Sequence, residues 1–245
     1  RLDLYLNLNK LLSTDILDRL RPLVKRRAVF EPWQYIVGGV DFARAFIKTD
    51  RRALIPRPET EYLCELLIAY YKDKAAPQRI ADIGTGTGAI VIALAQAFPG
   101  AELWGVDYSA EALSLAQENI QANGLSGKIQ LLQSNWCEKL QGSFDLIVSN
   151  PPYLTHAEWE NAQPEVRGFE PEEALVADNE GLACLEIILK QAFPILSPRC
   201  GLLVFETGLG QHAALSTLAL DRGYSPIQSY KDLSKRDRYL WLWRD

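Results

Sequence analysis

The fold is decided by the stretch Arg79-Ile80-Ala81-Asp82-Ile83-Gly84-Thr85-Gly86-Thr87-Gly88. Its first half, residues 79–83, has the apolar character of a buried strand and runs directly into three alternating glycines. Helix-forming residues begin immediately afterwards, at Ala89. Glycines permit a tight turn and let the backbone approach a ligand that lies over the strand ends. The stretch therefore predicts a strand, a ligand-binding turn and a helix, in that order.

The glycine spacing is G-x-G-x-G, whereas sites that bind the pyrophosphate of a dinucleotide typically have G-x-G-x-x-G. No Lys-Ser or Lys-Thr follows the glycines, which excludes a phosphate-binding P-loop. A second predicted strand ends at Asp107, about 20 residues past the last glycine, where a carboxylate can bind both ribose hydroxyls of a nucleoside. We therefore predict a nucleoside cofactor site formed by Gly84, Thr85, Gly86, Thr87, Gly88 and Asp107. The alternative is a turn that only packs a helix, with Asp107 capping the next helix beside Ser109.

Short apolar segments alternate with amphipathic ones from residue 79 onward. The predicted strands are Arg79–Ile83, Glu102–Val106, Ile129–Gln133, Phe144–Ser149, Gly201–Glu206, Ser225–Tyr230 and Tyr239–Trp243. The predicted helices are Ala89–Ala97, Ala110–Asn123, Leu182–Phe193 and Gln211–Arg222, preceded by one from about residue 60 to residue 71. This alternation indicates an α/β fold with a mostly parallel sheet covered on both faces. No helix separates the last two strands, so we expect them to pair antiparallel at one edge.

The sequence before residue 59 has a different character. Residues 1–30 carry leucines at helical spacing, which predicts the remainder of a small helical domain with these leucines in its core. Residues 31–58 contain aromatics, glycines and prolines, which predict a hairpin and a linker to a domain over residues 59–245. The sequence lacks methionine and opens at Arg1 within the first predicted helix. We therefore expect the true N-terminus, with any targeting segment, to be missing.

Composition limits the class of function. The net charge of −5 argues against stable nucleic-acid binding, and no apolar run approaches the ~20 residues that span a bilayer. The four cysteines are scattered and only two histidines are present. We therefore expect neither a disulfide framework nor a metal site. The scattered cysteines also indicate a reducing compartment.

The fourth predicted strand leads into Asn150-Pro151-Pro152-Tyr153, at the same sheet edge as the glycine turn. An NH2 group attached to a carbonyl or an aromatic ring is a poor nucleophile, so methyl transfer to it needs the nitrogen aimed at the methyl carbon. The Asn150 side-chain oxygen can accept one N–H and the Pro151 carbonyl the other, while the prolines hold both acceptors in place. Tyr153 offers a flat face for a planar amide or base. The turn predicts methyl transfer to such a nitrogen, with no metal and no histidine base.

The sequence resembles the HemK/PrmC family of release factor glutamine methyltransferases over nearly its whole length from residue 33. The resemblance is carried by Trp33-Gln34-Tyr35-Ile36-Val37-Gly38, Leu54-Ile55-Pro56-Arg57-Pro58-Glu59-Thr60-Glu61, Asp82–Gly88, Asn150–Tyr153, and Phe169-Glu170-Pro171 followed by Ala174-Leu175. It implies a seven-stranded, Rossmann-like class I methyltransferase sheet, preceded by a helical domain that helps to grip a class 1 peptide chain release factor. The substrate it implies is the glutamine of a Gly-Gly-Gln motif, and the cytoplasm or an organelle is the expected location.

The resemblance also implies roles for particular residues. Residues 84–88, Asp107, Trp136 and Asn150 would contact S-adenosylmethionine, and residues 150–153 would hold the glutamine, with Asn150, Pro151 and Tyr153 acting in catalysis. The family usually has an acid where Asn135 stands, and the asparagine oxygen can still accept a hydrogen bond from adenine. Trp136 can pack on the adenine, although it can equally be a core aromatic.

Several alternatives remain open from the sequence. The Asn-Pro-Pro-Tyr turn also occurs in adenine-N6 methyltransferases acting on DNA or RNA, and a non-enzymatic scaffold that binds the cofactor would not need Asn150. Arg57, Glu59 and Thr60 either wall the site or position the substrate loop, or else begin a helix together with Glu61. Glu170 and Glu206 are either acids near the site or solvated side chains.

Overall fold

The computed structural model describes residues 2–244. Its largest element is a sheet of seven strands in the order β5-β4-β3-β6-β7-β9-β8. These strands are β3 (Arg79–Ile83), β4 (Glu102–Asp107), β5 (Ile129–Gln133), β6 (Leu146–Ser149), β7 (Gly201–Glu206), β8 (Tyr224–Lys231) and β9 (Asp237–Arg244). The first five named run parallel, whereas β9 pairs antiparallel with both β7 and β8. The sheet confirms the predicted α/β fold and the antiparallel final pair.

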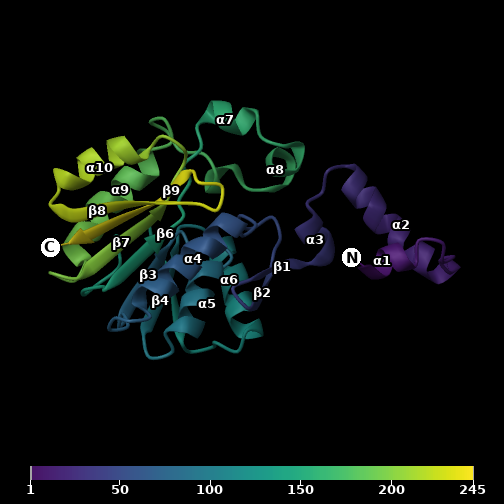
Figure 1. Cartoon of the computed structure of the whole chain (residues 1–245), viewed down its shortest axis with the longest axis horizontal. Coiled ribbons are helices and arrows are strands. Elements are labelled where there is room, and N and C mark those ends of the chain that lie inside the picture. Colours follow the sequence, from purple (N-terminus) through teal and green to yellow (C-terminus); the bar gives the residue numbers. More distant parts are fainter. Residues whose placement is uncertain (1, 245) are drawn as a thin grey trace.

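Helices cover both faces of this sheet (Figure 1). One face packs against α4 (Pro58–Tyr71), α5 (Ala89–Ala97) and α6 (Ala110–Ala122), and the other against α9 (Ala183–Ala192) and α10 (His212–Leu220). Alternate strand residues point to opposite faces. On β7, for example, Leu202 and Val204 join the core under α4 and α5, while Leu203 and Phe205 join the core under α9 and α10.

The order of the strands determines where a ligand can bind. Strand β3 lies in the middle of the sheet, paired on one side with β4 and on the other with β6. The chain runs from β3 outward to β4 and β5, and the connection after β5 returns to β6 on the other side of β3. This reversal leaves a crevice at the carboxyl ends of β3 and its neighbours. The register aligns Ile83 with Ser149. Gly84 and Asn150, each one residue further on, therefore lie at neighbouring positions on this edge.

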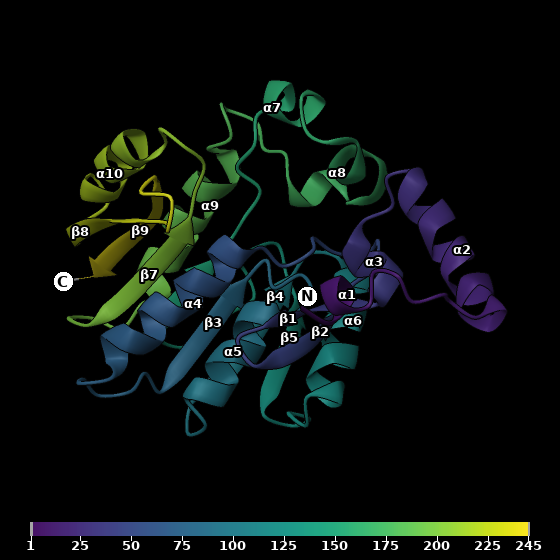
Figure 2. The ribbon, with the colours of Figure 1, turned by 45° about the vertical axis from the view of Figure 1, so that its right-hand side comes forward.

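Two smaller parts surround the sheet edge. A hairpin of β1 (Gly39–Phe42) and β2 (Ala45–Lys48) precedes α4, and an insertion after β6 contains α7 (His156–Glu160), α8 (Pro164–Phe169) and η1 (Glu172–Ala174). The short η2 (Phe193–Ile195) follows α9. Figure 2 shows α7 and α8 at the top of the molecule, with α8 beside α2 and α3. An ion pair between Arg27 and Glu165 joins this insertion to the N-terminal helices.

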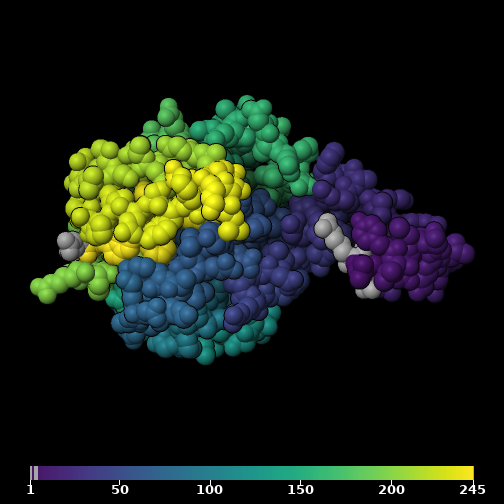
Figure 3. Space-filling model, viewed as in Figure 1, coloured from purple at the N-terminus to yellow at the C-terminus, as the bar shows by residue number. Residues whose placement is uncertain are grey.

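The structure of the N-terminal region differs from the predictions in two respects. Helices α1 (Leu2–Leu6) and α2 (Thr14–Ala28) project from the rest of the molecule (Figures 1 and 3). Helix α2 has no buried residue, and its leucines at positions 20 and 23 are exposed, so the prediction that they form a core is wrong for the structure described. The segment predicted as hairpin and linker also contains a short helix, α3 (Trp33–Val37), that the sequence pattern did not reveal.

Other differences concern the ends of elements. Phe144 lies outside β6 and forms only an isolated bridge with Leu196, so the predicted strand began two residues too early. The predicted helix over residues 211–222 is shorter, because α10 begins at His212 and ends at Leu220. Such shifts reflect the frayed hydrogen bonding at helix and strand ends.

Candidate functional site

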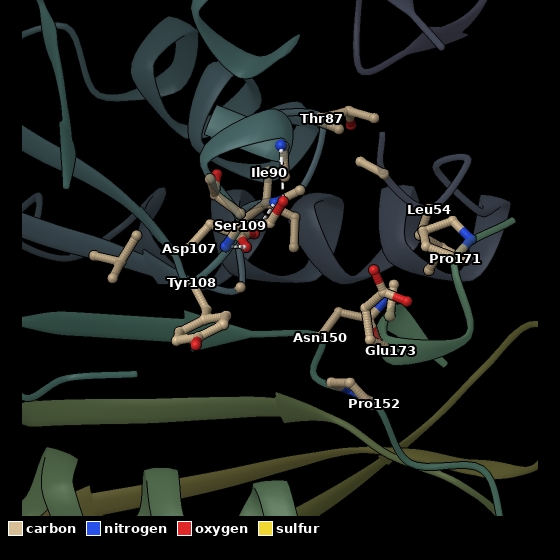
Figure 4. Close-up of a pocket in the computed structure, with 18 of the residues that line it drawn as sticks. Leu54, Thr87, Ile90, Asp107, Tyr108, Ser109, Asn150, Pro152, Pro171 and Glu173 are labelled. Atoms are coloured by element: carbon tan, nitrogen blue, oxygen red, sulfur yellow. Dashed lines mark hydrogen bonds between the residues drawn. The ribbon is translucent and has the colours of Figure 1, made fainter. Parts of the chain in front are cut away.

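A cavity of about 350 Å³ opens at the carboxyl edge of β3, β4 and β6. Part of its lining is drawn in Figure 4, where Asn150, Pro152, Glu173, Pro171 and Leu54 lie around one end and Asp107, Tyr108 and Ser109 around the other. Its size falls in the range of pockets that bind small organic ligands. The residues that line it are Arg52, Ala53, Leu54, Pro56, Arg57, Thr60, Gly84, Thr85, Gly86, Thr87, Ala89, Ile90, Val106, Asp107, Tyr108, Ser109, Ala112, Ser134, Asn135, Trp136, Asn150, Pro152, Pro171, Glu173 and Ala174.

The start of the glycine turn is held by hydrogen bonds to β4. The backbone N–H groups of Gly84 and Thr85 both donate to the Val106 carbonyl, at 2.8 and 2.9 Å. Gly86 has a φ of +54°, a left-handed conformation that an L side chain adopts only at a cost. Gly84, at φ +73°, is close enough to Trp136 that an added Cβ would lie 3.6 Å from the ring. The turn is thus fixed by β4 and leaves its backbone open to the cavity.

Asp107 ends β4 beneath this turn. One carboxylate oxygen accepts the Gly86 N–H at 2.8 Å and the other accepts the Ser109 N–H at 2.9 Å. Burial raises the pKa of Asp107, and these backbone bonds oppose the rise. Each carboxylate oxygen has a second lone pair, so Asp107 can still accept hydrogen bonds from a ligand. Ser109, rather than Asp107, caps α6 by accepting the Ala112 N–H.

Trp136 follows β5 and lines the cavity with a half-buried ring. Its φ is +53°, which is uncommon for a large side chain and is typical of residues held in place by their surroundings. The neighbouring Asn135 also borders the cavity, and its NH2 group donates to Glu138 at 2.9 Å. That bond occupies the nitrogen of Asn135 and leaves its side-chain oxygen able to accept.

The Asn-Pro-Pro-Tyr turn is divided between the cavity and the protein interior. Asn150 and Pro152 belong to the cavity lining, whereas Pro151 and Tyr153 lie beside it. The Tyr153 hydroxyl donates to the Glu206 carboxylate at 3.1 Å, and the Arg238 guanidinium lies 5.7 Å from the centre of its ring. Tyr153 therefore anchors the end of the turn, and its predicted use as a flat platform for the substrate stays a prediction.

Two buried polar side chains, Glu206 and Thr60, lie next to this turn and are hydrogen-bonded to it. Glu206 ends β7 with 1% of its surface exposed, and Thr60 lies in the first turn of α4 with 5% exposed. Thr60 donates to Glu206 at 2.8 Å and accepts from the Asn150 side-chain nitrogen at 3.0 Å. The alternative that Glu206 is solvated is therefore wrong. Glu59 instead points away, where it pairs with Arg236 and its carbonyl accepts from Tyr239.

A second buried acid, Glu170, holds together two segments that line the cavity. Glu170 accepts from the Arg57 guanidinium at 2.5 Å and from the Ile55 N–H at 2.9 Å, with 2% of its side chain exposed. This pairing fastens the insertion after β6 to the segment before α4, and it rules out a solvated Glu170. Both segments contribute to the lining, the insertion through residues 171, 173 and 174 and the segment through residues 52–54, 56 and 57. The motifs around Arg57 and Glu170 were the only sequence signal for these walls.

No helix within residues 2–244 has the length and apolar character needed to cross a bilayer. No group of three or more His, Cys, Asp or Glu side chains in the same range is arranged to hold a metal ion.

Comparisons with known proteins agree with this geometry. Residues 1–38 match the family model "PrmC N-terminal domain", and residues 60–165 match "Methyltransferase small domain". The fold resembles a 16S rRNA N2 methyltransferase of T. Thermophilus solved with AdoMet and guanosine, with a TM-score of 0.60, 21% identity and coverage of 84% of this chain and 49% of that one. This likeness shows the class I methyltransferase fold.

Two relatives share more of the sequence. A release factor glutamine methyltransferase of Chlorobaculum tepidum is 39% identical over 98% of this chain and 84% of its own length. The enzyme of the same name from Lactococcus lactis is 39% identical over 96% of this chain and 86% of its own length. With these relatives, the two matching family models and the glycine and Asn-Pro-Pro-Tyr turns around one cavity, the chain belongs to the release factor glutamine methyltransferase family.

Proposed function

We propose that this chain transfers a methyl group from S-adenosylmethionine to the side-chain amide nitrogen of the glutamine in the Gly-Gly-Gln motif of a class 1 release factor. The observation that carries the proposal is the position of Asn150, which follows β6 and borders the same cavity as the glycine turn after β3. The names of the relatives that match nearly the whole chain support the same substrate. The proposed location is the cytoplasm or an organelle in which translation terminates.

The residues around the cavity fit this cofactor. Asp107 keeps lone pairs for ribose hydroxyls, and the ring of Trp136 offers a surface on which adenine can pack. Residues 84–87 of the glycine turn line the cavity, and Gly88, which packs against Ala116, ends the turn beside it. We assign these residues and Asn150 to cofactor binding. When bound, S-adenosylmethionine supplies a methyl group on a positively charged sulfur, and that sulfur keeps the electron pair of the broken bond.

The chain's own part in the reaction is to aim and polarise the acceptor nitrogen. The Asn150 side-chain oxygen accepts one N–H of the glutamine amide and the Pro151 carbonyl accepts the other, which turns the nitrogen lone pair toward the methyl carbon. The nitrogen gains positive charge as its lone pair forms the new bond, and it then loses one N–H proton to water. Two oxygen acceptors in fixed positions stabilise this charge as it develops. Pro152 and Tyr153 complete the proposed glutamine site.

The N-terminal region is proposed to contact the release factor. Residues 1–30 would belong to a helical substrate-binding domain, residues 31–58 to a linker, and residues 59–245 to the catalytic domain. Leu20, Leu23 and Val24 are exposed on α2. They offer apolar surface for a protein partner. The acidic net charge gives a nucleic-acid substrate no comparable support.

A labelling experiment tests the proposed substrate. The purified chain is incubated with cofactor labelled in its methyl group and with a release factor, duplex DNA or RNA in separate reactions. We expect label only in the release factor, and none in a release factor whose motif glutamine is replaced by alanine. Label that enters only nucleic acid would establish the adenine alternative, and binding of the cofactor without transfer to any of the three would establish the scaffold.

A further inference from the structure

The buried carboxylate of Glu206 is linked by hydrogen bonds to both ends of the Asn-Pro-Pro-Tyr turn, to Tyr153 directly and to Asn150 through Thr60. One of its oxygens accepts from the Tyr153 hydroxyl at 3.1 Å, and the other accepts from the Thr60 hydroxyl at 2.8 Å. Thr60 in turn accepts from the Asn150 side-chain nitrogen at 3.0 Å. The three contacts join α4, the turn after β6 and the end of β7, whose residues are 53 to 146 positions apart in sequence.

The alternation of side chains along the strands explains why these groups meet. Even-numbered residues of β6 and β7, such as Val148 and Val204, point to the sheet face that α4 covers. Asn150 and Glu206 continue the same alternation at the carboxyl ends of the two adjacent strands. Thr60, in the first turn of α4, is buried against this edge. The contact is therefore a consequence of strand register and helix position, and not of a flexible surface.

These hydrogen bonds run in one direction, from the Asn150 side-chain nitrogen to the Thr60 hydroxyl and from that hydroxyl to Glu206. The Thr60 hydroxyl has a single hydrogen, which it donates to Glu206. Thr60 then has only lone pairs to offer Asn150, so Asn150 must present its NH2 group to Thr60. The carbonyl oxygen of the Asn150 carboxamide is thereby directed away from Thr60. This assignment follows from the hydrogen-bond network, which is how the two ends of an asparagine amide are told apart.

We propose that Glu206 and Thr60 are positioning residues that fix the Asn150 carboxamide with its oxygen toward the methyl acceptor, so that the site accepts only groups that donate N–H bonds. This rests on the proposed function and adds the source of its specificity. With the amide reversed, Asn150 would offer NH2 to the substrate and would favour a carboxylate, such as that of glutamate, over the glutamine amide. The direction of these hydrogen bonds therefore lets the site distinguish glutamine from glutamate, although the two side chains have nearly equal shape.

The surroundings of Glu206 act on its charge in opposing ways. Burial raises the pKa of Glu206, while the hydrogen bonds from Thr60 and Tyr153 and the charge of Arg238 oppose the rise. Arg238 itself is buried and donates to the Thr207 carbonyl at 2.7 Å, which holds its charge close to this edge. Removing the Thr60 hydroxyl leaves Asn150 without its partner and leaves either orientation of the amide open.

The test compares Thr60→Val, which has the same shape without the hydroxyl, with Thr60→Ser, which keeps it. We expect Thr60→Val to lower kcat on the release factor on the order of 10- to 100-fold, in the way that loss of a supporting partner commonly does. We expect Thr60→Ser to restore most of the turnover and both variants to bind S-adenosylhomocysteine as the wild type does. Thr49→Val removes another buried threonine hydroxyl outside the cavity lining and should leave turnover unchanged.

A second readout does not depend on catalysis. In 15N spectra, the side-chain NH2 signal of Asn150, assigned by its loss in Asn150→Ala, should exchange slowly with solvent in the wild type and in Thr60→Ser, and quickly in Thr60→Val. Equal exchange rates in Thr60→Val and the wild type, or unchanged kcat in Thr60→Val, would overturn the proposal. If the wild type fails to methylate the release factor, the proposed function fails instead, and the exchange measurement still decides the orientation of Asn150.

Discussion

Asn150→Ala is expected to lose roughly 100- to 1,000-fold or more in kcat on the release factor, as is typical when one preorganised polar partner of a transition state is removed. The reason is that the alanine variant keeps the shape of the turn but loses the side-chain oxygen that accepts an N–H of the substrate. The amide nitrogen is then neither aimed nor helped to carry positive charge. Single-turnover rates with saturating cofactor measure this loss without interference from product release.

The same variant should still bind the cofactor product. Asn150 is one of many residues around the cavity, and the glycine turn and Asp107 remain intact in the variant. Titration calorimetry with S-adenosylhomocysteine should therefore give a Kd within a few-fold of the wild type. Asn123→Ala, at the end of α6, is the matched control and should retain full turnover. Full activity in Asn150→Ala would refute the role assigned to the turn.

Asp82→Asn is expected to remove a large pH dependence from the free energy of unfolding. Asp82 lies in β3 with no surface exposed, where one carboxylate oxygen accepts from the Thr85 hydroxyl at 2.6 Å and from the Val91 N–H at 3.2 Å. The other oxygen has no hydrogen-bond partner among residues 2–244. Burial raises the pKa of Asp82 from 3.8 to about 7, because the charged form loses its hydration.

Whether stability rises or falls with pH depends on which of the two pKa values of Asp82, folded or unfolded, is higher. The folded state holds the Asp82 proton up to about pH 7, whereas the unfolded chain releases it near pH 4. The stability that the protonated side chain contributes is therefore fully present below pH 4 and is lost as the pH rises to about 7. The gap between the two pKa values corresponds to ~4 kcal/mol over this window.

Denaturant unfolding of the wild type and Asp82→Asn at several pH values measures this contribution. The wild type should lose up to ~4 kcal/mol between pH 4 and pH 7.5 that the variant does not lose. Burial also raises the pKa values of Asp107 and Glu206, but both residues are present in both proteins and cancel in the difference. Asp73→Asn, at an exposed position, controls for the loss of one negative charge. Parallel stability curves for wild type and Asp82→Asn would contradict the expectation.

Most of the sheet could be predicted from local patterns, because buried parallel strands are short apolar runs separated by amphipathic helices. The bounds of β3, β5 and β7 and of α5 agree with the prediction. The insertion of β9 between β7 and β8 was not predicted, since strand order depends on pairings between distant residues. The five-residue helix α3 was missed because its aromatic and branched residues also suit a strand.

The candidate site was predicted only in part. Residues 84–87 of the glycine turn, Asp107, Trp136 and Asn150 do border one cavity, because a parallel sheet brings the carboxyl ends of its strands to one edge. Gly88 lies outside the lining, where it packs against Ala116 of α6. Pro151 and Tyr153 lie beside that cavity, since the turn passes from the cavity into the interior. The bond from Asn150 to Thr60 could not be predicted, because it joins residues 90 positions apart through the placement of α4. The walls formed by Glu170 and Arg57 depend on the same kind of long-range packing.

The most direct measurement is a crystal structure of the chain with S-adenosylhomocysteine and a peptide that contains Gly-Gly-Gln. We expect the glutamine side-chain nitrogen within hydrogen-bond distance of both the Asn150 side-chain oxygen and the Pro151 carbonyl, with the sulfur on the side to which that nitrogen's lone pair points. A glutamine amide bound elsewhere, or an Asn150 that turns its NH2 group toward the peptide, would contradict it.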